Sequence, residues 1–179
     1  MVKPIKSKYS PQVGDIVVGR VQEIANKRWR IDIKASGYAY LSLNSTYIPE
    51  QRKKNEEDEF NMRRIMREGD LVVAEVHSTN ADHSCNLHTR NPKYGRLEAG
   101  RLIEVGHRQV RRQKHHMLAL GEVGVILGNN GNVFLSNHSR TAPTNHKEPF
   151  KAAPPITPQQ FTQIALLGNI LNILGQEGL

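Results

Sequence analysis

Cysteine is nearly absent from this 179-residue sequence, and no apolar run approaches the roughly 20 residues that a membrane-spanning helix needs. The single Cys85 excludes an intrachain disulfide and a cysteine-rich zinc site. The first residues, MVKPIKSK, lack the apolar centre of a secretory signal peptide. These absences predict an intracellular protein with no membrane segment.

Acidic residues are also scarce, with 17 Asp and Glu against 25 Lys and Arg. The formal net charge of +8 favours a polyanionic partner, whose binding should weaken as the salt concentration rises. The length allows two small domains, and the composition and pattern of the sequence change near residue 91. We therefore divide the chain into an N-terminal extension (1–10), a first domain (11–91) and a second domain (92–179).

The most informative tract runs from Val13 to Leu43 and alternates like β-strands. In RWRIDI (28–33) and YAYLSL (38–43), apolar residues take every second position, as in strands with one buried and one solvated face. The solvated face then carries arginine beside tyrosine, which can neutralise phosphates and stack on bases. The predicted RNA contacts are Lys27, Arg28, Arg30, Tyr38 and Tyr40, with His77 and His88 as further candidates.

Glycine-containing turns and two later strands extend this pattern. Gly19 inside the first strand and Ser36-Gly37 before the third resemble the S1 variety of the OB fold, a five-stranded Greek-key barrel. Further strands are predicted over 70–76 and 84–89. OB-type barrels serve several ligand classes, so the pattern alone leaves other ligands open, and the net charge favours nucleic acid. Trp29 shares the phase of the apolar residues, which favours a core position over base stacking.

The segment between the third and fourth strands is dense in charge, with Arg52–Lys54 before Glu56–Glu59. A solvated loop followed by a short helix is the simplest interpretation, and a binding arm is the alternative. Ile65 and Met66 follow Met62 at spacings of three and four, so we expect an apolar stripe to close one end of the barrel.

In the second domain, two β-like runs flank Gly128, Asn129, Asn130 and Gly131. Asn-Gly between such runs predicts a tight hairpin turn. These four residues also match the GxxG loop with which KH domains clamp a nucleic-acid backbone. A KH loop joins two helices, whereas this turn joins two strands, so we favour a packing role over phosphate clamping.

A helix is predicted from Pro158 onward. Thr157 and Gln160 form a capping box, and Ile156 and Phe161 a hydrophobic staple. Apolar residues then continue to Leu174 around a broad face, which therefore needs packing partners.

The barrel pattern, the basic stretch VRRQKHHM (110–117) and VGVILGNNGNVFLS (123–136), in this order, resemble the Rrp4-type cap subunit of the eukaryotic RNA exosome. The resemblance implies an S1 barrel followed by a KH-like α+β domain, and no catalytic residues. The implied partners are single-stranded RNA, the RNase PH-like ring subunits and other exosome subunits. The implied role is to guide RNA into 3′ to 5′ processing and decay, including ribosomal RNA maturation, in nucleus, nucleolus and cytoplasm.

Two departures from that family are expected. The barrel pattern begins by residue 11, so we expect the family's N-terminal domain to be missing. The KH-like part is expected to be shortened, because one helix follows the GNNG sequence.

The basic stretch offers a second candidate surface, directed at RNA or at an acidic neighbouring subunit. Its members are Arg108, Arg111, Arg112 and Lys114, to which His115 and His116 are expected to add. The histidines lack the spacing of zinc sites, so neither a metal nor a cofactor is predicted. The acidic cluster lies in a predicted flexible loop, a poor place for preorganised acid and base chemistry.

Two other function classes stay open. One is an autonomous S1-type RNA-binding protein, which would show its full affinity alone. The other is a purely structural subunit, whose basic patches would pair with acidic protein surfaces and whose aromatic residues would be buried.

Overall fold

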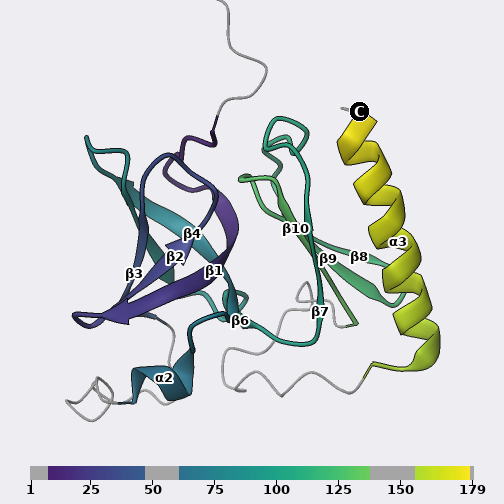
Figure 1. The fold of residues 1–179 in the computed structure, drawn as a ribbon, viewed down its shortest axis with the longest axis horizontal. Helices are drawn as coiled ribbons and strands as arrows, with labels where there is room; N and C mark the ends of the chain where they lie inside the picture. Colours follow the sequence, from purple (N-terminus) through teal and green to yellow (C-terminus); the bar gives the residue numbers. More distant parts are fainter. Residues whose placement is uncertain (1–7, 47–60, 138–155, 178–179) are drawn as a thin grey trace, which may run out of the picture.

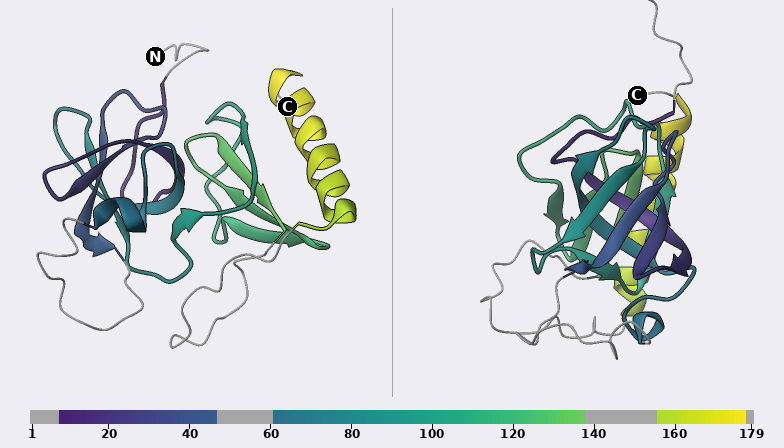
Figure 2. Two further views of the ribbon diagram at one scale, coloured as in Figure 1. Left: turned by 60° about the horizontal axis from the view of Figure 1, so that its bottom comes forward. Right: turned by 90° about the vertical axis from the view of Figure 1, so that its left-hand side faces the viewer.

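The chain folds into a closed barrel, a second sheet and a helix that follow one another across the molecule (Figure 1). The structure is a computed structural model that describes residues 8–46, 61–137 and 156–177. In Figure 1 and in the left view of Figure 2, the second sheet lies between the barrel and the C-terminal helix. Within the described ranges, no helix has the length and apolarity to cross a membrane.

Five strands close the barrel, which confirms the predicted S1/OB-like architecture. They are β1 (Ile16–Ala25), β2 (Arg28–Asp32), β3 (Ala39–Thr46), β4 (Leu71–Thr79) and β5 (Cys85–Thr89). The order is β1-β2-β3-β5-β4, and β4 pairs with β1 to complete the ring. The β3–β5 pair is parallel, and the others are antiparallel. A further strand, β6 (Gly95–Leu97), pairs with β4 outside this ring.

The predicted alternation is confirmed by burial. Trp29 and Leu41 are fully buried, and Ile31 is nearly so, whereas the residues between them face outward. The Trp29 indole Nε1–H donates to the Met66 carbonyl oxygen at 3.1 Å. Trp29 is therefore a core residue, and its buried ring is not available to stack on a base.

One end of the barrel is closed by α2 (Met62–Ile65) and the residue that follows it (Figure 1). Met62 and Met66 are buried in the barrel core, and Ile65 packs against it, as the spacing predicted. The charged run Arg52–Lys54 and Glu56–Glu59 lies outside the described residues.

Gly19 permits the close approach of β1 and β2. A Cβ atom at this position would lie 2.5 Å from Ile31 Cγ2 and 2.7 Å from the Asp32 carbonyl oxygen. The irregularity in the β1–β2 register comes later, between Val21 and Glu23. The glycine that we expected at a bend thus serves tight packing.

The second sheet is antiparallel and has the order β7-β10-β9-β8. Its strands are β7 (Gly100–Glu104), β8 (Met117–Leu120), β9 (Val123–Leu127) and β10 (Asn132–Ser136). The helix α3 (Pro158–Glu177) covers the face turned away from the barrel. For the second part of the chain, the structure shows these strands and this helix.

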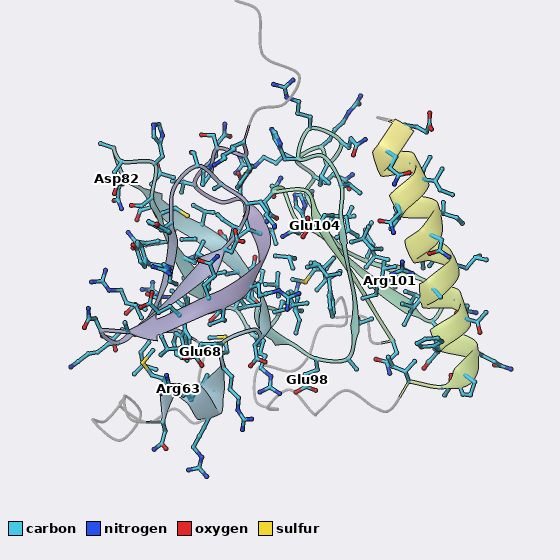
Figure 3. All side chains as sticks on the ribbon, in the orientation of Figure 1. Arg63, Glu68, Asp82, Glu98, Arg101 and Glu104 are labelled. Carbon is cyan, nitrogen blue, oxygen red and sulfur yellow. The ribbon has the colours of Figure 1, made fainter. Side chains whose placement is uncertain are left out.

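Two sets of contacts fix α3. Arg101, which points from β7 toward α3 in Figure 3, donates from Nη1 to the Ala165 carbonyl oxygen and to Asn169 Oδ1, each at 3.2 Å. The predicted capping box is confirmed, because Gln160 N–H donates to Thr157 Oγ1 and Thr157 N–H to Gln160 Oε1.

The apolar residues of α3 are only partly covered. Ile164 and Gly168 are buried against the sheet, whereas five large apolar side chains stay exposed. They are Phe161, Leu166, Ile170, Ile173 and Leu174. Phe161, the predicted partner of Ile156 in a staple, is 65% exposed, while Ile156 packs against the core beneath the helix.

The GNNG turn (Gly128–Gly131) joins β9 to β10 as a hairpin and lies against the barrel. Gly128 N–H donates to the Asn132 carbonyl oxygen at 2.9 Å, and Gly131 has the positive φ, +86°, that this turn requires. A Cβ atom at Gly131 would lie 2.3 Å from the Val105 carbonyl oxygen. Both asparagines of the turn are buried.

These asparagines pair with the edge of β1 that β2 leaves open. The β1–β2 ladder begins at Arg20, so the backbone groups of Ile16 and Val18 on that side have no strand partner. Ile16 N–H donates to Asn129 Oδ1 at 2.9 Å, and Asn129 N–H donates to the Ile16 carbonyl oxygen at 2.7 Å. The turn thus supplies the hydrogen bonds that a neighbouring strand would otherwise supply.

Asn130 continues this pairing. Its Nδ2 donates to the carbonyl oxygens of Val18 at 2.8 Å and Ile33 at 3.0 Å, while its Oδ1 accepts from Val18 N–H at 3.3 Å. Asn132 Nδ2 also donates to the Val18 carbonyl oxygen, at 2.7 Å. The barrel and the second sheet are therefore joined through buried polar contacts.

We expect Asn130→Ala to lower the free energy of unfolding by about 2–4 kcal/mol, because the buried Val18 N–H and the Ile33 carbonyl oxygen lose their hydrogen bonds to its side chain, while the Val18 carbonyl oxygen keeps the one from Asn132. Urea denaturation measures this change. The control is Asn44→Ala at an exposed position of β3, which should shift stability by about 0.5 kcal/mol or less. Equal effects of the two substitutions would contradict the role given to Asn130.

Candidate nucleic-acid interface

The outward side chains of β2 and β3 form one surface. Arg30 lies opposite Tyr40 in the β2–β3 register, and Arg28 lies opposite Ser42. Tyr38 immediately precedes β3 and is 58% exposed. We call Arg28, Arg30, Tyr38 and Tyr40 the tyrosine–arginine face. The sequence prediction that these four side chains share one solvated side is consistent with their observed positions.

Each arginine of this face contacts a tyrosine ring. Arg30 Cζ lies 5.1 Å from the centroid of the Tyr38 ring, and Arg28 Cζ lies 5.6 Å from that of Tyr40. The two tyrosine rings are 6.3 Å apart and tilted by 51°. These are cation–π distances, and they place two positive charges beside two aromatic rings.

Glu23 of β1 borders the face and holds Arg30. Its Oε2 lies 2.9 Å from Arg30 Nη1, and the pair is partly exposed. A hollow of about 280 Å³ lies beside this pair and is lined by Glu23, Ala25, Asn26, Arg28, Arg30 and Tyr40. Lys27, in the β1–β2 turn next to the hollow, is exposed and has a positive φ of 61°.

The two candidate histidines belong to a neighbouring cluster on β4 and β5. The His77 and His88 rings are 5.6 Å apart, and His88 Nε2 lies 3.9 Å from Glu75 Oε1. Tyr94 donates from its hydroxyl to Glu75 Oε2 at 2.9 Å. His77 is exposed, whereas the His88 side chain is only 18% exposed. Of the two, His77 alone offers a largely open ring.

Burial lowers the pKa of His88, and the nearby His77 and Arg90 lower it further against the opposing effect of Glu75. Burial and the hydrogen bond to Glu75 raise the pKa of Tyr94 above its ordinary value. His88 is thus held in its neutral form near pH 7, and the Tyr94 hydroxyl keeps its proton.

The residues of the basic linker between β7 and β8 line three different hollows. Its residues Arg108, Arg111, Arg112 and Lys114 are all exposed. Arg112 binds the start of the barrel, with Nη2 donating to the Val13 carbonyl oxygen at 2.9 Å and Nε lying 3.5 Å from Asp15 Oδ1. Arg108 lines the same hollow as Arg112, whereas Arg111 and Lys114 line two others.

His116 was expected on this basic surface, and that expectation is wrong. The residue is buried, with Nε2 accepting from Gln113 N–H at 3.1 Å and Nδ1 lying 2.7 Å from the Leu127 carbonyl oxygen. Because Nε2 accepts, Nδ1 carries the proton and donates to Leu127. The ring thereby fastens the linker to β9, while the adjacent His115 is exposed.

The comparisons with known proteins agree on one family. Residues 8–78 match the family described as the S1 domain of RRP4. The exosome complex component rrp4 of Schizosaccharomyces pombe is 45% identical over 141 residues, which cover 77% of this chain and 43% of that protein.

The chain belongs to the Rrp4 family of exosome components.

Other members of the Rrp4 family extend the match. The RRP4 homolog of Caenorhabditis elegans is 36% identical over 178 residues, which cover 96% of this chain and 59% of that protein. The RRP4 of Saccharomyces cerevisiae is 44% identical over 142 residues, covering 78% of this chain and 40% of that protein. The chain spans about two fifths of the length of the two yeast relatives.

A solved structure shows the same fold. The crystal structure of a proposed exosome complex RNA-binding protein superposes with a TM-score of 0.54 at 24% identity, over 72% of this chain and 75% of that chain. At this identity the likeness concerns the fold alone.

Sequence reasoning missed Glu23 and the residues around the Arg112 contact, namely Lys8, Tyr9, Asp15 and His107. Tyr9 and Asp15 lie at the beginning of the barrel and His107 on the linker, about a hundred positions later. No local period links them, because hydrogen bonds and packing across the fold bring them together.

We expect part of the loss of stability between pH 7 and pH 5 to come from His88. Folding lowers its pKa, so the unfolded chain binds the proton more readily. The stabilisation is fully present above about pH 6.5 and is lost as the pH falls through the folded pKa. Urea denaturation at both pH values should therefore show a smaller loss for His88→Gln, with His115→Gln as the exposed control. If His88→Gln loses as much stability between pH 7 and pH 5 as the wild type does, this assignment is contradicted.

Proposed function

We propose that this chain binds single-stranded RNA through the tyrosine–arginine face, as part of a non-catalytic cap subunit of the RNA exosome. The cap would guide RNA into a ring of RNase PH-like subunits for 3′ to 5′ processing and degradation, including ribosomal RNA maturation. We further propose that it acts in nucleus, nucleolus and cytoplasm, as expected for an exosome subunit.

The observation that carries this proposal is the pairing of exposed aromatic rings with guanidinium groups on one face of the barrel. Tyr38 offers an exposed ring on which a base can stack, and Arg30 lies 5.1 Å from it, close enough to neutralise the adjoining phosphate. Tyr40 and Arg28 repeat the arrangement two residues along the strands. Two rings 6.3 Å apart fit successive bases of a single strand better than a rigid duplex.

The chemistry of this face supports binding without catalysis. Its carboxylate, Glu23, is paired with Arg30 at 2.9 Å, whereas acid and base catalysis requires groups free to exchange protons with the substrate. Among the described residues, no cluster of three or more His, Cys, Asp or Glu side chains is placed to hold a metal. We therefore assign hydrolysis to other subunits of the complex.

We also infer that the second part of the chain is a KH-like region that serves assembly. Its support is the four-stranded sheet covered by α3 and the order of the parts along the chain. The GNNG turn is buried against β1, so its glycines are used for packing between the two sheets.

We expect Tyr38→Ala combined with Tyr40→Ala to weaken binding of a short fluorescent oligouridine at least about fivefold, because each base stacked on an aromatic ring contributes about 1–3 kcal/mol. Fluorescence anisotropy at constant salt measures the affinity. Both side chains lie outside the core, so circular dichroism should show an intact fold.

Two controls accompany this pair. Tyr38→Phe combined with Tyr40→Phe keeps the rings and should preserve most of the affinity. Phe161→Ala removes an aromatic ring that is 65% exposed on α3, far from the barrel, and should leave the affinity unchanged. Equal affinities of wild type and the Tyr→Ala pair would exclude base stacking on this face.

A purely structural subunit is the second candidate, and one observation favours it. Both arginines of the face already contact tyrosine rings within the chain, so these side chains have partners without RNA. Gel filtration of the chain mixed with a purified RNase PH-like ring, with and without RNA, separates the candidates. We expect the chain to form a complex with the ring, and we expect this complex to bind RNA more weakly when it contains the Tyr→Ala pair. A complex whose RNA affinity is unaffected would establish the structural role, and RNA binding without a complex would establish an autonomous RNA-binding protein.

A further inference from the structure

A hollow of about 390 Å³ lies where the start of the barrel meets the linker between β7 and β8. We call it the junction pocket. Its charged and ring-bearing lining residues are Lys8, Tyr9, Asp15, His107, Arg108 and Arg112. The tyrosine–arginine face does not include any of them.

The walls of the junction pocket are held in place by contacts between the two parts of the chain. Arg112 Nη2 donates to the Val13 carbonyl oxygen at 2.9 Å, and the Tyr9 and His107 rings meet edge to face at 6.2 Å. Asn129 anchors the remaining wall to Ile16 of β1. A pocket with such fixed walls needs little ordering to receive a ligand.

Positive charge dominates this pocket. Asp15 supplies the carboxylate, and it already accepts from the Tyr9 hydroxyl at 2.6 Å and from Gln12 N–H at 3.1 Å, with Arg112 Nε at 3.5 Å. Its side chain is only 6% exposed. The lining thus carries three cationic side chains, Lys8, Arg108 and Arg112, against the one carboxylate of Asp15. Burial and the charge of Arg108 lower the pKa of His107, in keeping with a positive surrounding.

We propose that the junction pocket is a binding site for a phosphate group. Guanidinium and ammonium groups around a hollow suit a tetrahedral oxyanion, because they donate several charge-assisted hydrogen bonds to it. The volume exceeds that of one phosphate and leaves room for an attached ribose.

The backbone of the RNA strand held by the tyrosine–arginine face is one source of this phosphate, and here the inference rests on the proposed function. Tyr9, at the wall of the pocket, forms a β-bridge with Ala35, which lies three residues before Tyr38. The pocket and the face are therefore connected through one short loop. The other source is a free phosphate or nucleotide.

The test substitutes Lys8→Gln together with Arg108→Gln, while Arg112 is kept because it joins the linker to the barrel. Both substituted residues are exposed, and the melting temperature checks the fold. The matched control, Arg64→Gln together with Arg67→Gln, removes the same charge from exposed positions in and after α2. Oligouridine affinity is measured over a series of salt concentrations, and inorganic phosphate binding is followed by NMR at the His107 ring.

We expect the Lys8/Arg108 pair to weaken oligouridine binding about three- to tenfold more than the control and to flatten the slope of log affinity against log salt by about 1. This result would assign the pocket to the RNA backbone. In the alternative outcome, inorganic phosphate shifts the NMR signals of the His107 ring saturably, the Lys8/Arg108 pair abolishes these shifts, and oligouridine affinity is unchanged. That result would assign the pocket to a free phosphate or nucleotide.

The two proposals fail separately. If the wild-type chain binds no oligouridine, the proposed function fails, and the phosphate titration still decides the junction pocket. If the Lys8/Arg108 pair matches the control in oligouridine binding and inorganic phosphate gives no saturable shift at His107, the phosphate site is overturned.

Discussion

The open edge of β1 is the constraint on which the arrangement of this molecule depends. Between Ile16 and Val18, β1 pairs with β4 on one side only, because its ladder with β2 begins at Arg20. Unpaired backbone groups in a buried position would each cost about 1–3 kcal/mol, so something must pair with them. The GNNG turn does so with asparagine side chains and one backbone amide. The barrel and the second sheet are therefore one packed unit, and the linker between them is held against both.

This arrangement has consequences for both candidate sites. The tyrosine–arginine face depends on the barrel alone, since the alternation that buries Trp29 and Ile31 necessarily turns Arg28 and Arg30 outward. The junction pocket depends on the docking of the two sheets, because its walls come from the segment before β1, the linker between β7 and β8, and the GNNG turn. A change in the GNNG turn would thus disturb the second site directly and the first only through the stability of the barrel.

Much of the fold could be predicted from local patterns. The five barrel strands, the buried Trp29, the methionine stripe and the capping box of α3 follow from periods of two or about 3.6 and from local hydrogen bonding. His116 could not be placed in this way, and neither could the outward Phe161. Adjacent histidines in a basic stretch look alike in sequence, and the carbonyl oxygen of Leu127 decides which one is buried.

The local order of residues is enough to predict an S1-like barrel with arginine and tyrosine on one solvated face, because strand alternation is a property of neighbouring residues. It also placed a tight turn at GNNG and a helix after Pro158. What the turn binds emerges from long-range packing, since Asn130 and Val18 are 112 positions apart and their hydrogen bonds have no sequence period. The same holds for the junction pocket, whose charges come from two distant segments that packing alone brings together.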